Sequence, residues 1–157
     1  MLSATLSVLV MSAMALGTQV RRDGEGFWIP FRNIFGYCID VKDSNFQGNN
    51  PLQWWPCATG NPNQKWTHRP VERAGPITIT SYKGETFCLD ATVYAEVGRS
   101  PTINSCSPDH PGPRFAWTTA DGYIKSSMGD YCILLRDLGD PSNYAGAPVV
   151  FRSCPSS

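Results

Sequence analysis

Six cysteines constrain this chain more than any other feature, because they fall into three similar units. The units begin at Cys38, Cys88 and Cys132 and end at Cys57, Cys106 and Cys154. The two cysteines of a unit are about twenty positions apart and successive units begin about fifty positions apart, which indicates one structural element copied three times. An even number of cysteines at regular spacing predicts a disulfide framework rather than metal ligands. Six cysteines can pair in many ways, and their spacing alone does not choose among them.

The chain beyond residue 22 predicts short β-strands separated by turns. The expected strands are 27–31, 37–41, 51–55, 64–67, 77–82, 87–91, 102–105, 115–118, 123–126, 131–135 and 148–152. The 14 glycines and 13 prolines suit a chain rich in turns. Many short strands at this spacing predict an all-β barrel or sandwich, and three copies of one unit favour a closed threefold barrel.

The length and charge of the chain bound its size and its partners. At 157 residues it is long enough for one domain with a buried core. Its 13 basic and 13 acidic residues balance. Because no positive field would gather nucleic acid or an anionic membrane, we expect neither as a partner.

The N-terminal segment predicts secretion. Residues 2–17 are apolar and uncharged, and Ala13 and Ala15 offer a site for signal peptide cleavage. This stretch is too short for a comfortable membrane span. Arg21 and Arg22 are either a dibasic processing site or a solvated terminus. We therefore expect a signal peptide and short pro-segment over 1–22 and a mature domain over 23–157, in an oxidising compartment where disulfides persist.

Three segments of the first unit resemble the repeat of ricin B-type lectins, with its Gln-x-Trp signature. They read Cys38-Ile39-Asp40-Val41, Leu52-Gln53-Trp54-Trp55-Pro56-Cys57 and Asn63-Gln64-Lys65-Trp66. The resemblance extends over residues 27–154 and decreases from the first unit to the third. It implies a β-trefoil with repeats at about 27–70, 71–120 and 121–157. It also implies disulfides that join Cys38 to Cys57, Cys88 to Cys106 and Cys132 to Cys154, each worth about 3 kcal/mol.

Strand parity predicts a hairpin with two different faces in the first unit, because alternate residues of a strand point to opposite sides. The apolar back carries Ile39, Val41, Leu52 and Trp54, and the front carries Asp40, Gln53 and Trp55 around the disulfide. Two tryptophans that recur at the repeat period, Trp66 and Trp117, are expected in the core because of their large buried area.

The front of this hairpin has the chemistry of a sugar site. A carboxylate accepts strong hydrogen bonds from hydroxyls, an indole offers a flat surface to C–H groups, and amides donate and accept. The resemblance implies that Asp40 and Asn63 bind hydroxyls, that Trp55 stacks, and that Gln53 and Gln64 assist or brace. It also implies a galactose-like ligand. Each polar residue has a structural alternative as well, such as a turn cap or a loop asparagine.

The second unit retains only part of this set. Asp90 matches the first aspartate, but Thr102 and Asn104 stand where the glutamine and the stacking tryptophan are expected. Arg114 and Phe115 replace the Asn-Gln pair. Without a stacking surface, we expect the second unit not to bind the same ligand.

The third unit has lost the set entirely. Leu134 replaces the aspartate, and Val150 and Arg152 replace the glutamine and the aromatic residue. We therefore expect a protein with one binding site. A final Gln-x-Trp strand does not follow Cys154, so we expect an open barrel edge, left unpaired or covered by an oligomer partner or a second chain.

The remaining residues do not suggest an enzyme. Glycoside hydrolysis needs two carboxylates that flank a bond, and no partner for Asp40 is evident. We expect His68 and His110 to be ordinary loop residues. Neither metal-ligand spacing nor a cofactor motif is present. The expected function is a secreted carbohydrate-binding protein without catalysis. The alternative is a secreted β-trefoil that binds a protein target, such as a protease.

Overall fold

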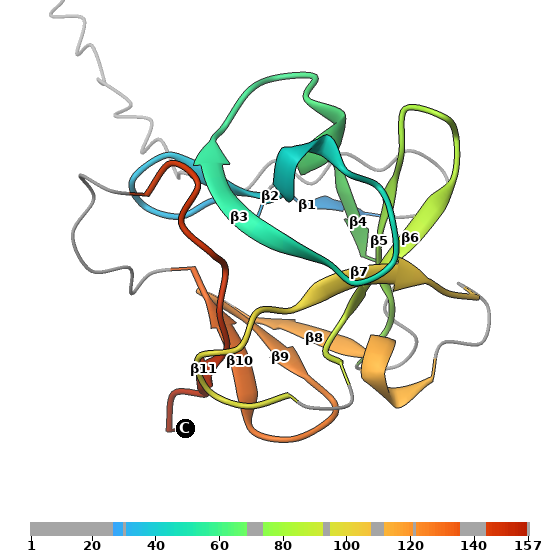
Figure 1. The fold of residues 1–157 in the computed structure, drawn as a ribbon. Helices are drawn as coiled ribbons and strands as arrows, with labels where there is room; N and C mark the ends of the chain where they lie inside the picture. The colour runs from blue at the N-terminus through green and yellow to red at the C-terminus, as the bar shows by residue number, and fades with distance from the viewer. Residues whose placement is uncertain are drawn as a thin grey trace, which may run out of the picture.

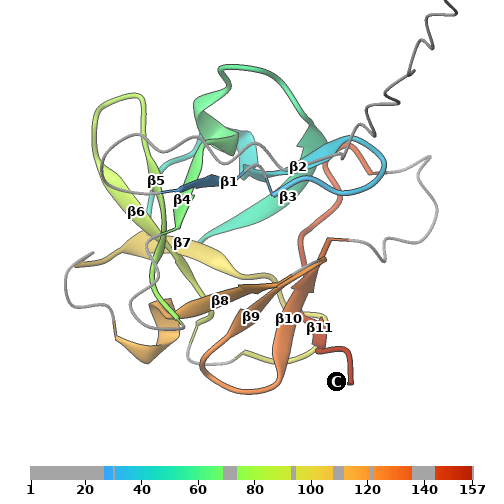
Figure 2. The same cartoon turned by 180° about the vertical axis from the view of Figure 1, so that it is seen from behind.

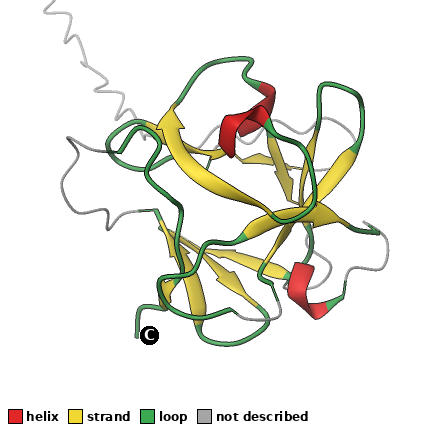
Figure 3. Ribbon diagram, viewed as in Figure 1, coloured by secondary structure: helices red, strands yellow, loops and turns green. Residues whose placement is uncertain are grey.

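The computed structural model describes residues 27–29, 31–68, 74–92, 95–107, 112–120, 122–135 and 144–156. Strands and loops make up nearly all of this part of the chain (Figure 3). The expected signal peptide, its processing site and His110 lie outside the described residues.

The strands of the first repeat are β1 (Phe27–Ile29), β2 (Tyr37–Val41), β3 (Asn50–Pro56) and β4 (Trp66–His68). The second repeat contains β5 (Ile77–Thr80), β6 (Thr86–Asp90), β7 (Thr102–Ser105) and β8 (Trp117–Ala120). The third contains β9 (Tyr123–Ser126), β10 (Tyr131–Leu134) and β11 (Arg152–Ser153). Three short 3-10 turns, η1 (Lys42–Ser44), η2 (Pro62–Gln64) and η3 (Pro113–Phe115), lie between these strands.

The strands form two antiparallel sheets, of order β1-β4-β5-β6-β7-β3-β2 and β11-β10-β9-β8. The four-stranded sheet occupies one end of the molecule in both views (Figure 1 and Figure 2). An isolated bridge pairs Gly75, which precedes β5 of the first sheet, with Trp117, the first residue of β8 in the second sheet. The described chain is all-β, as predicted.

A hairpin closed by a disulfide recurs in the three repeats. The disulfides join Cys38 to Cys57, Cys88 to Cys106 and Cys132 to Cys154. The register of the hairpins recurs as well, since the opening cysteine faces Trp55 in the first, Asn104 in the second and Arg152 in the third. The pairing that the resemblance implied is therefore confirmed, and so is the threefold repetition.

Two tryptophans occupy equivalent places in the core. Trp66 and Trp117 are buried, and each indole N–H donates at 2.9 Å to a strand carbonyl, that of Ile39 in the first repeat and that of Leu89 in the second. Each acceptor residue lies between the cysteine and the aspartate of its repeat. The indoles thereby fix the strand that presents the aspartate, and their prediction as core residues is confirmed.

Two predicted strands differ most from the structure. Of residues 148–152 only Arg152 lies in β11, because Pro148 makes just an isolated bridge to Gln53 and the next N–H donors, of Val149 and Phe151, bond to two different segments. Gln64 does not begin a strand but ends η2, because Asn61 caps that turn and Pro62 begins it.

The prediction for His68 was also wrong. It is not a loop residue but the last residue of β4, and only 3% of it is exposed. Its ring Nε2 lies 3.2 Å from the Trp117 carbonyl oxygen, so it joins a strand of the first repeat to one of the second. None of the helical turns in the described ranges is long or apolar enough to cross a membrane.

Candidate functional site

The β2–β3 hairpin presents the first-repeat residues as strand parity predicted. Asp40 faces Gln53 across the ladder, and Cys38 faces Trp55. The apolar back consists of Ile39, Val41, Leu52 and Trp54, all at most 3% exposed. The front is less open than expected, because Asp40 and Gln53 are buried and only Trp55, at 44%, is well exposed.

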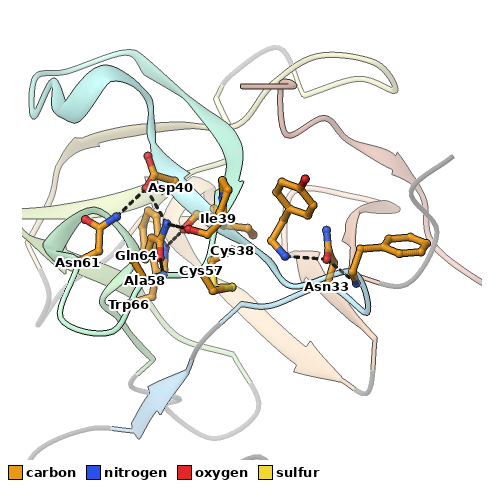
Figure 4. Close-up of a disulfide and its surroundings, with 12 residues drawn as sticks. Asn33, Cys38, Ile39, Asp40, Cys57, Ala58, Asn61, Gln64 and Trp66 are labelled. Carbon is orange, nitrogen blue, oxygen red and sulfur yellow. Dashed lines mark hydrogen bonds between the residues drawn. A yellow bond between two sulfur atoms is a disulfide. The ribbon is translucent and has the colours of Figure 1, made fainter. Parts of the chain in front are cut away.

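Three side-chain amides hold the Asp40 carboxylate. Gln53 Nε2 donates to Oδ1 at 3.0 Å, whereas Gln64 Nε2 and Asn61 Nδ2 donate to Oδ2 at 2.9 and 3.3 Å. Figure 4 shows Asn61 and Gln64 converging on Asp40 beside the Cys38–Cys57 disulfide. A carboxylate has about four acceptor positions. Since two of these three bonds go to Oδ2, Oδ1 retains capacity to accept a further hydroxyl.

Burial is the largest influence on the charge of this carboxyl. Loss of solvent raises the pKa of Asp40 above its ordinary value, and the nearby negative charge of Asp43 acts in the same direction. The hydrogen bonds from Gln53, Gln64 and Asn61 oppose that rise in pKa because they favour the ionised form. The Asp40 carboxylate is thus a partly desolvated acceptor, and hydrogen bonds to such an acceptor are electrostatically stronger than in bulk water.

Gln64 braces the loop that closes the hairpin. Its Oε1 accepts from the backbone N–H of Ala58 at 2.9 Å, and its Nε2 donates to the Pro56 carbonyl at 3.1 Å as well as to Asp40. One side chain therefore ties the end of β3 to the aspartate. The expected bracing role of Gln64 agrees with these contacts.

The η2 turn orients two asparagines differently. Asn61 Oδ1 accepts from the backbone N–H of Asn63 at 3.0 Å, while its Nδ2 reaches Asp40. Asn63 Nδ2 instead donates to Ser44 Oγ at 2.6 Å. Sequence reasoning selected Asn63 and missed Asn61. The available signal was the Asn61-Pro62 dipeptide, which is typical of a capped turn start.

The third repeat borders Trp55, which no sequence signal indicated. Residues 146–149 run along β3 beyond its short pairing with β7: Gly146 N–H donates to the Trp54 carbonyl, and Trp54 N–H donates to the Ala147 carbonyl, both at 2.8 Å. This C-terminal segment, red in Figure 1, passes beside β3. A Cβ placed on Gly146 would lie 3.9 Å from Trp55 Cζ3, which is ordinary contact. Gly146 therefore lies at the border of the indole surface.

The equivalent place in the second repeat is filled by the chain itself. Asp90 is fully buried and forms an ion pair with Arg114 through both Nε and Nη2. Asn104 Nδ2 donates to Asp90 Oδ2 at 2.6 Å, and the Thr92 backbone N–H donates to Oδ1 at 2.8 Å. Four donors thus occupy this carboxylate, and hydrogen bonding to Asp90 raises the pKa of Arg114. The Asp90 carboxylate is thus fully engaged within the chain, unlike that of Asp40.

The third repeat offers no acid at the corresponding position. Leu134 faces Tyr123 across the β9–β10 ladder, and Arg152 is exposed opposite Cys132. Within the described residues, no group of three or more His, Cys, Asp and Glu side chains is placed to hold a metal ion. Among the described residues, the first repeat alone combines this aspartate with an exposed indole.

The arrangement suits a ligand with hydroxyls on one edge and C–H groups on one face. The Asp40 carboxylate can accept from hydroxyls, the amides around it fix its orientation, and the exposed Trp55 indole offers a rigid apolar surface.

Comparisons with known proteins agree with this chemistry. The family model for the ricin-type beta-trefoil lectin domain matches residues 27–157. Beta-galactoside-specific lectin 3 of Viscum album is 36% identical over 63 residues, which are 40% of this chain and 10% of that lectin. Beta-galactoside-specific lectin 2 of Viscum album is 46% identical over 43 residues, 27% of this chain and 7% of that lectin. The aligned region thus spans a tenth or less of either relative.

The fold has a solved counterpart. The designed threefold symmetric protein ThreeFoil superposes with a TM-score of 0.58 at 19% identity, covering 78% of this chain and 85% of that protein. At this identity the likeness shows the fold alone, and the fold is a β-trefoil. Because the family model covers every described strand, this chain belongs to the ricin-type β-trefoil lectin family.

Proposed function

We propose that this chain is a secreted lectin domain with one site for a galactose-type sugar, formed by the first repeat. The observation that carries the proposal is the pairing of a buried, amide-held carboxylate with a half-exposed indole on one face of the β2–β3 hairpin. The proposed ligand contacts are Asp40, Gln53, Trp55 and Asn63, with Gln64 as a brace.

A galactose-type ligand is supported by two relatives that are named for beta-galactosides. Galactose offers adjacent hydroxyls to Asp40 and a C–H face to Trp55. One shallow site of this kind is expected to bind at about 1 mM, which corresponds to about −4 kcal/mol. The proposal assigns binding without catalysis. Several copies, brought together by association or fusion, would be needed for tight binding to a cell surface.

The test is retention of the oxidised protein on immobilised galactose, with elution by free galactose. Asp40→Ala and Trp55→Ala are expected to abolish retention. Two matched surface variants control for the chemical change: Asp130→Ala removes an exposed aspartate, and Tyr82→Ala removes an aromatic residue that is 70% exposed. Both are expected to be retained like the unmodified protein.

Two results would contradict the proposal. One is retention of the Asp40→Ala and Trp55→Ala variants at the unmodified level. The other is the absence of binding on a broad glycan array together with inhibition of a protease, which would favour a β-trefoil that binds protein.

A further inference from the structure

The loop between β2 and β3, residues 42–49, has an unusual backbone. Asp43, Ser44 and Asn49 have φ angles of 56°, 55° and 63°. Left-handed backbone is unfavourable for most L-residues, and aspartate and asparagine adopt it more readily than serine, so Ser44 is the least expected of the three. Two such residues in succession, Asp43 and Ser44, persist only where surrounding contacts determine the conformation.

The near end of this loop is held by the first repeat. Asn50 is buried and its Nδ2 donates to the Lys42 carbonyl at 2.9 Å, and the Asn45 backbone N–H donates to the same carbonyl at 3.1 Å. The turn around Asp43 and Ser44 is therefore closed by two bonds to one acceptor.

The far end is held by the second repeat. Asn49 N–H donates to Asn104 Oδ1 at 3.0 Å and Asn104 Nδ2 donates to Asn49 Oδ1 at 3.1 Å. Asn104 is itself fixed on Asp90. The approach is close, since a Cβ on Gly48 would lie 2.7 Å from Asn104 Oδ1. The filled aspartate cluster of the second repeat thus supports the loop.

The left-handed Ser44 makes one contact to the candidate site. Ser44 Oγ accepts from Asn63 Nδ2 at 2.6 Å, between two residues that are 19 positions apart. The bond is at the surface, where a single hydrogen bond adds little to stability. The turn holds Ser44 in an unfavourable conformation and directs its hydroxyl to Asn63, and this geometry points to a role at the site.

We propose that Ser44 is a positioning residue of the sugar site, which holds the Asn63 amide in one orientation next to the Asp40 cluster. The proposal rests on the proposed function and deepens it. With one N–H of Asn63 directed to Ser44, the amide keeps its carbonyl oxygen and its second N–H in fixed directions. A preordered amide binds a hydroxyl without the entropic cost of orienting itself.

The experiment is a double-mutant cycle on galactose affinity, measured by calorimetry on the oxidised protein. Ser44→Ala is expected to weaken binding about three- to tenfold, the range of one hydrogen bond. In an Asn63→Ala background the same change is expected to have no effect, because Ser44 then has no amide to position. Ser127→Ala, an exposed serine of the third repeat, is the matched control and is expected to bind normally.

A second variant separates positioning from stability. Ser44→Gly removes the hydroxyl and relieves the left-handed strain, so we expect weaker binding with an equal or higher unfolding temperature. Equal affinity of Ser44→Ala and the unmodified protein would overturn the inference, as would additive losses for Ser44 and Asn63. If the unmodified protein binds no galactose, the proposed function itself fails, and that result precedes any comparison of Ser44 variants.

Discussion

Asp40 provides the negative charge of the candidate site, and its burial disfavours that charge. Its pKa is raised chiefly by desolvation, so the folded protein holds the Asp40 proton at pH values where an unfolded chain has released it. The proton-linked stability of Asp40 therefore rises as the pH falls through its folded pKa. The proposed sugar binding favours the opposite form, because the ionised carboxylate can accept hydrogen bonds from hydroxyls at both oxygens.

We therefore predict that galactose affinity decreases as the pH falls from 7 toward 4, with a midpoint above the ordinary aspartate value of 3.8. Affinity is measured by calorimetry along a pH series, and the fold is followed by near-UV circular dichroism. Binding should decline while the native spectrum persists. A constant affinity down to pH 4 would show that Asp40 is not the acceptor.

The site residues were predictable only to the extent that they follow strand parity. Alternation along β2 and β3 placed Asp40, Gln53 and Trp55 on one face, as the structure shows. Burial of Asp40 could not be read from parity, because it comes from the η2 turn that brings Asn61 and Gln64 over the carboxylate. A turn of that kind depends on a cap and a proline rather than on periodicity.

The second-repeat hairpin, β6–β7, holds its aspartate in an internal ion pair with Arg114. Asp90 is fully buried, whereas the Arg114 side chain is 35% exposed. Removal of one partner from such a pair leaves a buried charge without compensation, which is a major source of destabilisation. The β6–β7 hairpin therefore depends on Arg114 for its stability. In the first-repeat hairpin, neutral amides hold the aspartate instead.

We predict that Arg114→Ala lowers the free energy of unfolding by about 2 kcal/mol, toward the low end for a broken buried pair because Arg114 is partly solvated. Arg114→Lys keeps the charge but not the two-pronged geometry and is expected to fall between. Urea unfolding of the oxidised protein at neutral pH measures both. Arg99→Ala breaks an exposed pair with Glu96 and is the control, with an expected midpoint close to the unmodified one. An equally small change for Arg114→Ala would contradict the argument.

At the level of elements, sequence patterns succeeded where local rules decide the outcome. Cysteine spacing identified the three repeats, and alternation identified the two faces of the first hairpin. The segment over 148–152 failed because its partners are distant: Val149 N–H donates to the Leu52 carbonyl and Phe151 N–H to the Arg99 carbonyl. Those bonds belong to the packing of the third repeat on the first two, which no single stretch of sequence encodes.

The three repeats are joined at buried contacts, and His68 lies at one of them. Its ring contacts the Trp117 carbonyl through Nε2 and Thr119 Oγ1 through Nδ1, at 3.2 and 3.4 Å. Burial lowers the pKa of His68 below its ordinary 6.5, and backbone hydrogen bonds with Trp117 and Gly75 offset only part of that effect. The unfolded chain therefore takes up a proton at a higher pH than the folded one.

This difference predicts that the stability of the whole domain falls as the pH is lowered through about 6.5, by at most about 1.4 kcal/mol per pH unit for one proton. Urea unfolding at pH 7.5, 6.5 and 5.5 measures the slope. Replacement of His68 by glutamine should remove this dependence. If that variant keeps the slope of the unmodified protein, His68 at the junction between the first and second repeats is not the titrating group.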